Sequence, residues 1–176
     1  MTDTVQELRA IFPALIPFPP LLADFVAWAE QFERGQLGWF EFEAQRLDDD
    51  WIENGAALAD QFALFIRLPD GSMVGFWKPD GDAGALPVVL LGSEGAQEVL
   101  GSTLEEFLWN WARGELGEAY DLMPDDQAGA EASDEQPADA RPALAAWLQE
   151  KSVRVQVKQV PDLKAFFADW QEKQIE

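Results

Sequence analysis

The 176-residue chain is 48% apolar, which is enough to bury the core of one domain. Its 33 acidic and 12 basic side chains give a net charge of −21, so we expect no direct binding to nucleic acid or to anionic membranes. The absence of Cys and His excludes disulfides, thiol nucleophiles, imidazole-based triads and the usual zinc sites, and we expect no metal or other cofactor.

The first residues predict neither a secretory signal nor a membrane anchor. Asp3 and Glu7 precede Arg9, which is the wrong charge order for a signal peptide. The apolar stretch 13–23 contains four prolines and is too short to cross a bilayer. We therefore expect a cytoplasmic protein.

Residues 21–32 predict a helix that packs by one face, with Gly35 ending the pattern. Its apolar stripe consists of Leu21, Phe25, Trp28 and Phe32. From residue 39 to 45 the period changes to two, because rings at Phe40 and Phe42 alternate with polar residues. This alternation predicts a half-buried strand with Glu41 and Glu43 on its outward face.

A β-hairpin is predicted over residues 62–79. Pro69, Asp70 and Gly71 supply a fixed φ, a side-chain turn bond and a positive φ between two apolar runs. The first run is apolar on nearly both faces, so we place it centrally in a sheet. Residues 86–91 predict a further strand, which a turn at 93–95 connects to residues 96–101.

Residues 103–113 predict the best-defined helix. Ser102 or Thr103 can cap its start, Glu105 or Glu106 can complete a capping box, and Gly114 marks its end. Its buried stripe comprises Leu104, Phe107, Leu108 and Trp111. Trp109 lies about 150° from this stripe at roughly 100° per residue, so we expect a second partner for its ring.

The C-terminal third begins with an acidic segment. Residues 115–140 hold nine acidic residues and no basic one, and residues 124–140 have the composition of a linker. Residues 141–176 then predict a short helix, a strand with alternating Val153, Val155 and Val157, and a terminal helix. The stripe of the terminal helix comprises Leu163, Phe166, Phe167 and Trp170. We expect this extension to pack on the same domain.

The order of these elements resembles the SUKH superfamily, which groups bacterial immunity proteins with fungal cell-wall-synthesis regulators of the Smi/Knr type. The likeness spans about residues 13–114 and rests on four segments: 13–32, 64–77, 88–95 and 102–108. It implies a SUKH-like core over residues 1–123, with an α+β fold in which helices pack on a mixed, mainly antiparallel sheet. It also implies a binding role without catalysis, because immunity proteins of this kind dock on toxins, many of them nucleases.

An acidic, Trp-containing surface is the expected site of protein binding. Large rings beside carboxylates are suited to basic side chains, and a nuclease must present a basic surface to phosphate. The expected protein-binding residues are Trp39, Glu41, Glu43, Asp48, Asp49, Asp50, Trp51, Glu53 and Trp109. The alternative is that the strand edge is simply solvated, that Trp51 is part of the core and that one of the aspartates caps a turn.

Three catalytic or metal-binding patterns are weaker. Glu41 and Glu43 would lie about 6.7 Å apart along one strand, near the spacing of inverting glycosidases, but they point the same way instead of flanking a substrate bond. The Asp-rich stretch 79–84 resembles a calcium loop, yet position 91, where a bidentate Glu is required, is Leu91. Ser93 stands in a stretch like a nucleophile elbow, but the chain has no His to complete a triad.

The leading hypothesis is therefore a non-enzymatic immunity protein that neutralises a toxin through an acidic surface. One alternative is an intracellular regulatory or scaffold adaptor of the same family. Another is a hydrolase that uses Glu41 with Glu43, or the run Asp48–Asp50.

Overall fold

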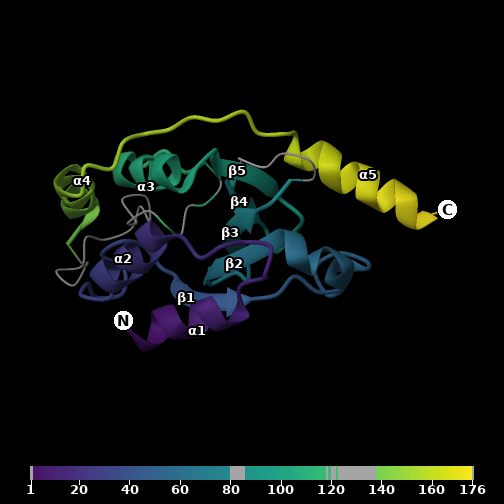
Figure 1. Ribbon diagram of the computed structural model, residues 1–176, viewed down its shortest axis with the longest axis horizontal. Helices are drawn as coiled ribbons and strands as arrows, with labels where there is room; N and C mark the ends of the chain where they lie inside the picture. Colours follow the sequence, from purple (N-terminus) through teal and green to yellow (C-terminus); the bar gives the residue numbers. More distant parts are fainter. Residues whose placement is uncertain (1, 80–85, 118, 120–121, 123–137, 176) are drawn as a thin grey trace, which may run out of the picture.

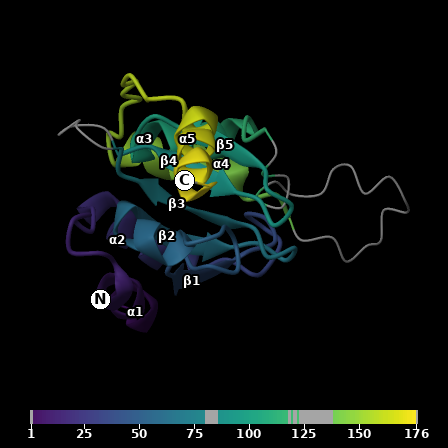
Figure 2. The ribbon, with the colours of Figure 1, turned by 90° about the vertical axis from the view of Figure 1, so that its right-hand side faces the viewer.

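The computed structural model describes residues 2–79, 86–117, 119, 122 and 138–175 (Figures 1 and 2). Its centre is a five-stranded antiparallel sheet in which every strand pairs with the next one along the chain. The strands are β1 (Glu41–Gln45), β2 (Phe62–Arg67), β3 (Met73–Trp77), β4 (Val88–Leu91) and β5 (Gln97–Gly101). The expected α+β class is confirmed, but the sheet is antiparallel throughout instead of mixed.

Helices cover both faces of this sheet. The helices are α1 (Asp3–Ile11), α2 (Pro20–Ala29), the 3₁₀ helix η1 (Gly55–Gln61), α3 (Leu104–Arg113), α4 (Arg141–Glu150) and α5 (Leu163–Ile175). The buried residues of α1, α2, α3 and α4 form one apolar cluster with one face of the sheet. Those of η1 and α5 form a second cluster with the opposite face.

The central strands are buried on both sides, as the apolar composition of residues 62–67 indicates. Along β4, Val88 and Leu90 enter the first cluster, whereas Val89 and Leu91 enter the second. The β2–β3 hairpin is confirmed: its turn contains Gly71 at a φ of 90°, and the Ser72 amide donates to Asp70 Oδ1 at 2.8 Å. The hydrophobic core therefore lies in two layers separated by the sheet.

Helix α3 forms as its sequence predicts. Thr103 is the N-cap, and its hydroxyl accepts from the Glu106 amide at 3.1 Å. The Glu106 carboxylate in turn accepts from the amide of Ser102 at 3.1 Å, and Gly114 ends the helix at a φ of 72°. These caps satisfy amides and carbonyls that have no partner within the helix.

Helix α1 has no counterpart among the elements that the sequence predicts. Thr2 caps the helix, accepting from the Val5 amide at 3.3 Å, and Val5 and Leu8 are buried against the first cluster. Two buried side chains at i and i+3 are too few to predict a helix from the sequence. A helix of nine residues is stable only because such side chains pack against the rest of the protein. Among the described residues, no helix is long and apolar enough to cross a membrane.

The predicted strand around Val155 does not form. Residues 151–162, which we call the strap, run extended from α4 to α5 past α3 and β5, along the top of Figure 1, and join no strand. The alternating valines favour an extended backbone, but this segment pairs with no strand of the sheet. Helices α4 and α5 confirm the other two elements expected there. Most of the acidic linker 124–140, and most of the Asp-rich stretch 79–84, lie outside the described residues.

Candidate functional site

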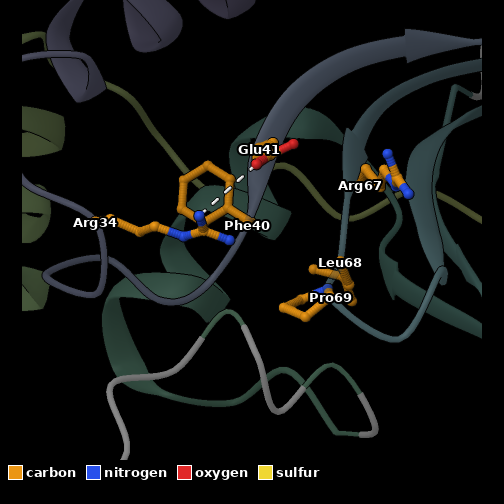
Figure 3. Close-up of a pocket in the computed structure, with 6 residues that line it drawn as sticks. All are labelled: Arg34, Phe40, Glu41, Arg67, Leu68 and Pro69. Carbon is orange, nitrogen blue, oxygen red and sulfur yellow. Dashed lines mark ion pairs between the residues drawn. The ribbon is translucent and has the colours of Figure 1, made fainter.

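A cleft of about 260 Å³ opens beside the start of β1 (Figure 3). Its lining comprises Arg34, Phe40, Glu41, Arg67, Leu68 and Pro69. A second hollow of about 220 Å³ shares Arg34, Phe40 and Glu41 with it and extends to the end of α2. The two cavities place guanidinium groups, a carboxylate and an aromatic ring around one edge of the sheet.

Two arginines pair with the carboxylates of β1. Glu41 Oε1 lies 3.8 Å from Arg34 Nη1, and Glu43 Oε2 lies 3.3 Å from Arg67 Nη1. All four side chains are between 42% and 59% exposed, so each pair contributes about 0–1 kcal/mol to stability. At contact distance, however, the pairs offset the negative charge that the sequence predicts for this strand.

The two glutamates do not form the arrangement that a glycoside hydrolase requires. Only Glu41 lines the cleft in Figure 3, and each carboxylate faces its own arginine. An acid–base pair must flank a substrate bond from two sides. This geometry does not favour the hydrolase alternative built on Glu41 and Glu43.

The chain beyond β1 forms an acidic turn, by which we mean Asp48, Asp49, Asp50 and Glu53. Asp48 Oδ1 accepts from the Asp50 amide at 3.1 Å, and Asp49 Oδ1 accepts from the Ala56 amide at 3.0 Å. All four residues are exposed, and none of the described Lys or Arg side chains forms an ion pair with them. The turn thus concentrates four negative charges without a described counter-charge.

The acidic turn is fastened to the second face of the sheet. The Trp51 indole Nε1 donates to the Gly92 carbonyl at 2.9 Å, and its ring lies 5.1 Å from that of Phe167 in α5. Asn54 Nδ2 donates to Gln174 Oε1 at 2.6 Å. Gly55 lies so close to the Asp48 carbonyl that a Cβ would not fit there. These contacts hold the backbone of the turn in one position, while the hydrogen bonds accepted by Asp48 and Asp49 orient two of its four carboxylates.

Trp51 and Trp109 have structural roles in this fold. Trp51 is half-buried and hydrogen-bonded, as the alternative interpretation of that residue proposed. The indole of Trp109 donates to the Val153 carbonyl at 3.0 Å, and the Arg113 guanidinium lies 5.5 Å from its ring. The strap is thus the second partner that the position of Trp109 on its helix requires.

Trp39 is the most exposed of the eight tryptophans, all of which the structure describes. Its residue surface is 38% accessible, and the Arg34 guanidinium lies 6.0 Å from its ring. Of the residues predicted for binding, Trp39 and the acidic turn are therefore those that offer free surface. β1 separates them by about 17 Å, at roughly 3.3 Å per residue.

Arg34 and Arg67 are the site residues that the sequence analysis missed. The antiparallel register places Arg67 directly opposite Glu41. Pairing the predicted strand 39–45 with the first strand of the predicted hairpin would therefore have pointed to Arg67. Glu43 is then the diagonal neighbour of Arg67 on the same face of the sheet, within reach of the long arginine side chain. Arg34 lies in the loop after α2, where no periodicity marks it.

Among the described residues, no three Asp or Glu side chains are grouped closely enough to hold a metal ion. The chain matches no family model, and comparison with curated proteins and with solved structures finds no significant match. The resemblance to SUKH proteins thus stays a prediction from the sequence.

Proposed function

We propose that this chain is a non-enzymatic binding protein, an immunity protein of the SUKH type, which docks through its acidic turn on a basic surface of a toxin. The observation that carries the proposal is an anchored turn that presents four exposed carboxylates without a described counter-charge. A nuclease presents cationic side chains to phosphate, and an acidic protein competes for those side chains. The same chemistry is available to any toxin with a basic active surface.

An anchored acidic turn suits this role for two reasons. The backbone of the turn is already ordered, so less conformational entropy is lost when the partner binds. Complementary charge also raises association rates, from about 10⁵–10⁶ M⁻¹s⁻¹ toward 10⁸ M⁻¹s⁻¹ or more at low salt. Rapid capture benefits an inhibitor that must act before a toxin reaches its substrate.

Trp39 extends the proposed interface beyond the charged turn. A standard interface buries about 800 Å² on each partner, which is wide enough to cover both ends of β1. An exposed indole at one end can supply contact area, while the carboxylates at the other end supply attraction at a distance. The paired glutamates between them then contribute little net charge.

The test begins with co-expression of the chain and the toxins encoded beside its gene. Neutralisation of one toxin, together with a purified complex, is the expected result. If none is neutralised and none binds, the immunity role is wrong.

The contribution of the acidic turn is tested by the double variant Asp50→Lys, Glu53→Lys. These two carboxylates make no described hydrogen bond, so their reversal leaves the fold intact. We expect the association rate with the toxin to fall at least tenfold at about 0.05 M salt and much less at about 0.5 M.

The matched control is Glu115→Lys, Glu150→Lys, which reverses two exposed carboxylates at the ends of α3 and α4, on the opposite face of the sheet from α5, and changes the net charge equally. The control should slow association far less than the variant in the turn. Equal slowing by both would show that net charge, and not the acidic turn, governs the encounter.

A further inference from the structure

The strap differs in charge from the rest of the molecule. The strap, residues 151–162, contains Lys151, Arg154 and Lys158 and one carboxylate, Asp162 at its end, whereas the whole chain carries a net charge of −21. Arg154 is exposed, and the strap that contains it runs along the outside of the protein past α3 (Figures 1 and 2). A basic segment on so acidic a protein marks a second surface with different binding preferences.

One side of the strap is bonded to the body of the protein. The Thr103 hydroxyl donates to the Gln156 carbonyl at 2.6 Å, and the Lys158 amide donates to Ser102 Oγ at 2.8 Å. In an extended chain, the amide and carbonyl of one residue point to the same side, and those of its neighbours point to the opposite side. From residue 155 to residue 158, the main-chain groups of Val155 and Val157 therefore face away from the start of α3, and the alternation breaks before Val155, because the Val153 carbonyl accepts from Trp109 of α3.

These outward groups are unpaired. Within the described part of the chain, the amides and carbonyls of Val155 and Val157 have no hydrogen-bond partner. In an antiparallel ladder, every second residue of a strand directs its amide and carbonyl toward the same neighbouring strand. Val155 and Val157 have this spacing. The strap thus offers four main-chain groups in the spacing that a further strand would need.

The side chains of the strap have the composition of an unfinished strand. Val155 is 39% exposed and Val157 is 74% exposed, although β-branched residues favour a pleated, half-buried surface. In an extended chain these valines share one face, and Arg154 and Lys158 share the other. A complementary strand would place apolar side chains beside the valines and a carboxylate beside Arg154.

We propose that the strap is a strand-addition site, which binds an extended segment of a partner protein in which carboxylate and apolar side chains alternate. The site lies apart from the acidic turn and has the opposite charge, so the proposal does not depend on the function proposed above. At 0.15 M ionic strength the screening length is about 8 Å, so the cations of the strap act on a bound segment more strongly than distant carboxylates do.

The test uses the full chain labelled with ¹⁵N and a blocked ten-residue peptide of five Glu-Val repeats, at 0.15 M salt. We expect saturating peptide to slow hydrogen exchange at the amides of Val155 and Val157 at least tenfold. The amides of α2 serve as an internal control and should be unaffected. A peptide of Lys-Val repeats should give no protection at any of these amides.

N-methylation of the peptide distinguishes a main-chain ladder from attraction between charges alone. In a strand, alternate amides face the same side, so methylating either every Val or every Glu removes the donors of one side only. One of these two peptides should lose binding and the other should retain it. If both bind equally well, the strap does not add a strand.

The charge requirement is tested by Arg154→Glu, with Lys173→Glu in α5 as the control that changes net charge equally. Arg154→Glu should weaken peptide binding at least threefold, and Lys173→Glu should change it less than twofold. The proposal is overturned if no peptide protects Val155 and Val157, or if the Lys-Val peptide protects them equally. It is also overturned if hydrogen exchange at these two amides is slowed without peptide, and more so at higher protein concentration. That result would show that a second copy of the chain binds to the strap.

Discussion

Replacing Trp51 by alanine distinguishes a structural indole from a binding one. The change removes the 2.9 Å hydrogen bond to the Gly92 carbonyl, at a cost of about 1 kcal/mol, because that carbonyl still accepts from the Gly95 amide at 3.0 Å. It also removes the edge-to-face contact with Phe167, which contributes about 0.5–1.5 kcal/mol beyond buried area. For a half-buried ring we therefore expect Trp51→Ala to lower the free energy of unfolding by about 3 kcal/mol.

Two further variants separate the components of this loss. Trp51→Phe keeps an aromatic ring beside Phe167 and removes only the donor, so it should cost about 1 kcal/mol. Trp39→Ala removes a ring that is 38% exposed and should lower the free energy of unfolding by about 1 kcal/mol or less, while weakening the complex with a toxin that we propose above.

Equilibrium unfolding in urea measures all three variants, provided that the slope m is unchanged. The reasoning is refuted if Trp51→Ala costs less than about 1 kcal/mol, because an indole anchored as described cannot be removed so cheaply. It is refuted equally if Trp39→Ala is the more destabilising of the two alanine variants.

Two other predictions concern α5 and α4. Phe167→Ala should lower the free energy of unfolding by about 3–5 kcal/mol, because its ring is 1% exposed and stacks on Phe62 at 5.7 Å. Asp169→Ala, on the exposed side of α5, should change the free energy of unfolding by about 0.5 kcal/mol or less. If the two variants lowered the melting temperature equally, the packing of α5 on the sheet would be contradicted. Burial raises the pKa of Asp139, but the hydrogen bonds from the side chain and amide of Arg141, together with its charge, outweigh burial and leave the pKa below its ordinary value. A lowered folded pKa stabilises the fold above the ordinary value of about 4 and ceases to do so as pH falls through the folded value. The advantage of the wild-type chain over Asp139→Asn in urea unfolding should therefore shrink below about pH 4, and an advantage independent of pH would contradict this origin.

The elements that the sequence predicts well are those whose causes are local. Helix α3 has its cap at Thr103, its reciprocal carboxylate at Glu106 and its stop at Gly114 within one short segment. The β2–β3 turn likewise contains Asp70 and Gly71 in adjacent positions. Helix α1 lacks an equally dense signal, because its stability depends on packing with residues far along the chain.

The candidate site depends on contacts between distant segments, and the sequence could predict it only in part. Alternation correctly placed the rings of β1 toward the core and its glutamates outward. The partner of Glu41 comes from the loop after α2, and the partner of Trp51 comes from the turn after β4, 41 residues away. Composition indicates that rings and carboxylates are present, but only the fold decides which of them are engaged internally.

In the strap, too, the sequence predicts the local conformation but not the contacts that the segment makes, and this difference bears on function. A run of alternating valines reports the conformation that the chain prefers, yet a strand also needs a neighbour to receive its amides and carbonyls. The fold supplies that neighbour on one side of the strap only, through Ser102 and Thr103. Water can satisfy the other side, and basic side chains are a common means of keeping such an edge free of unwanted partners. The exchange experiment decides between these roles, because a protective edge excludes both peptides, whereas a binding edge accepts the acidic one.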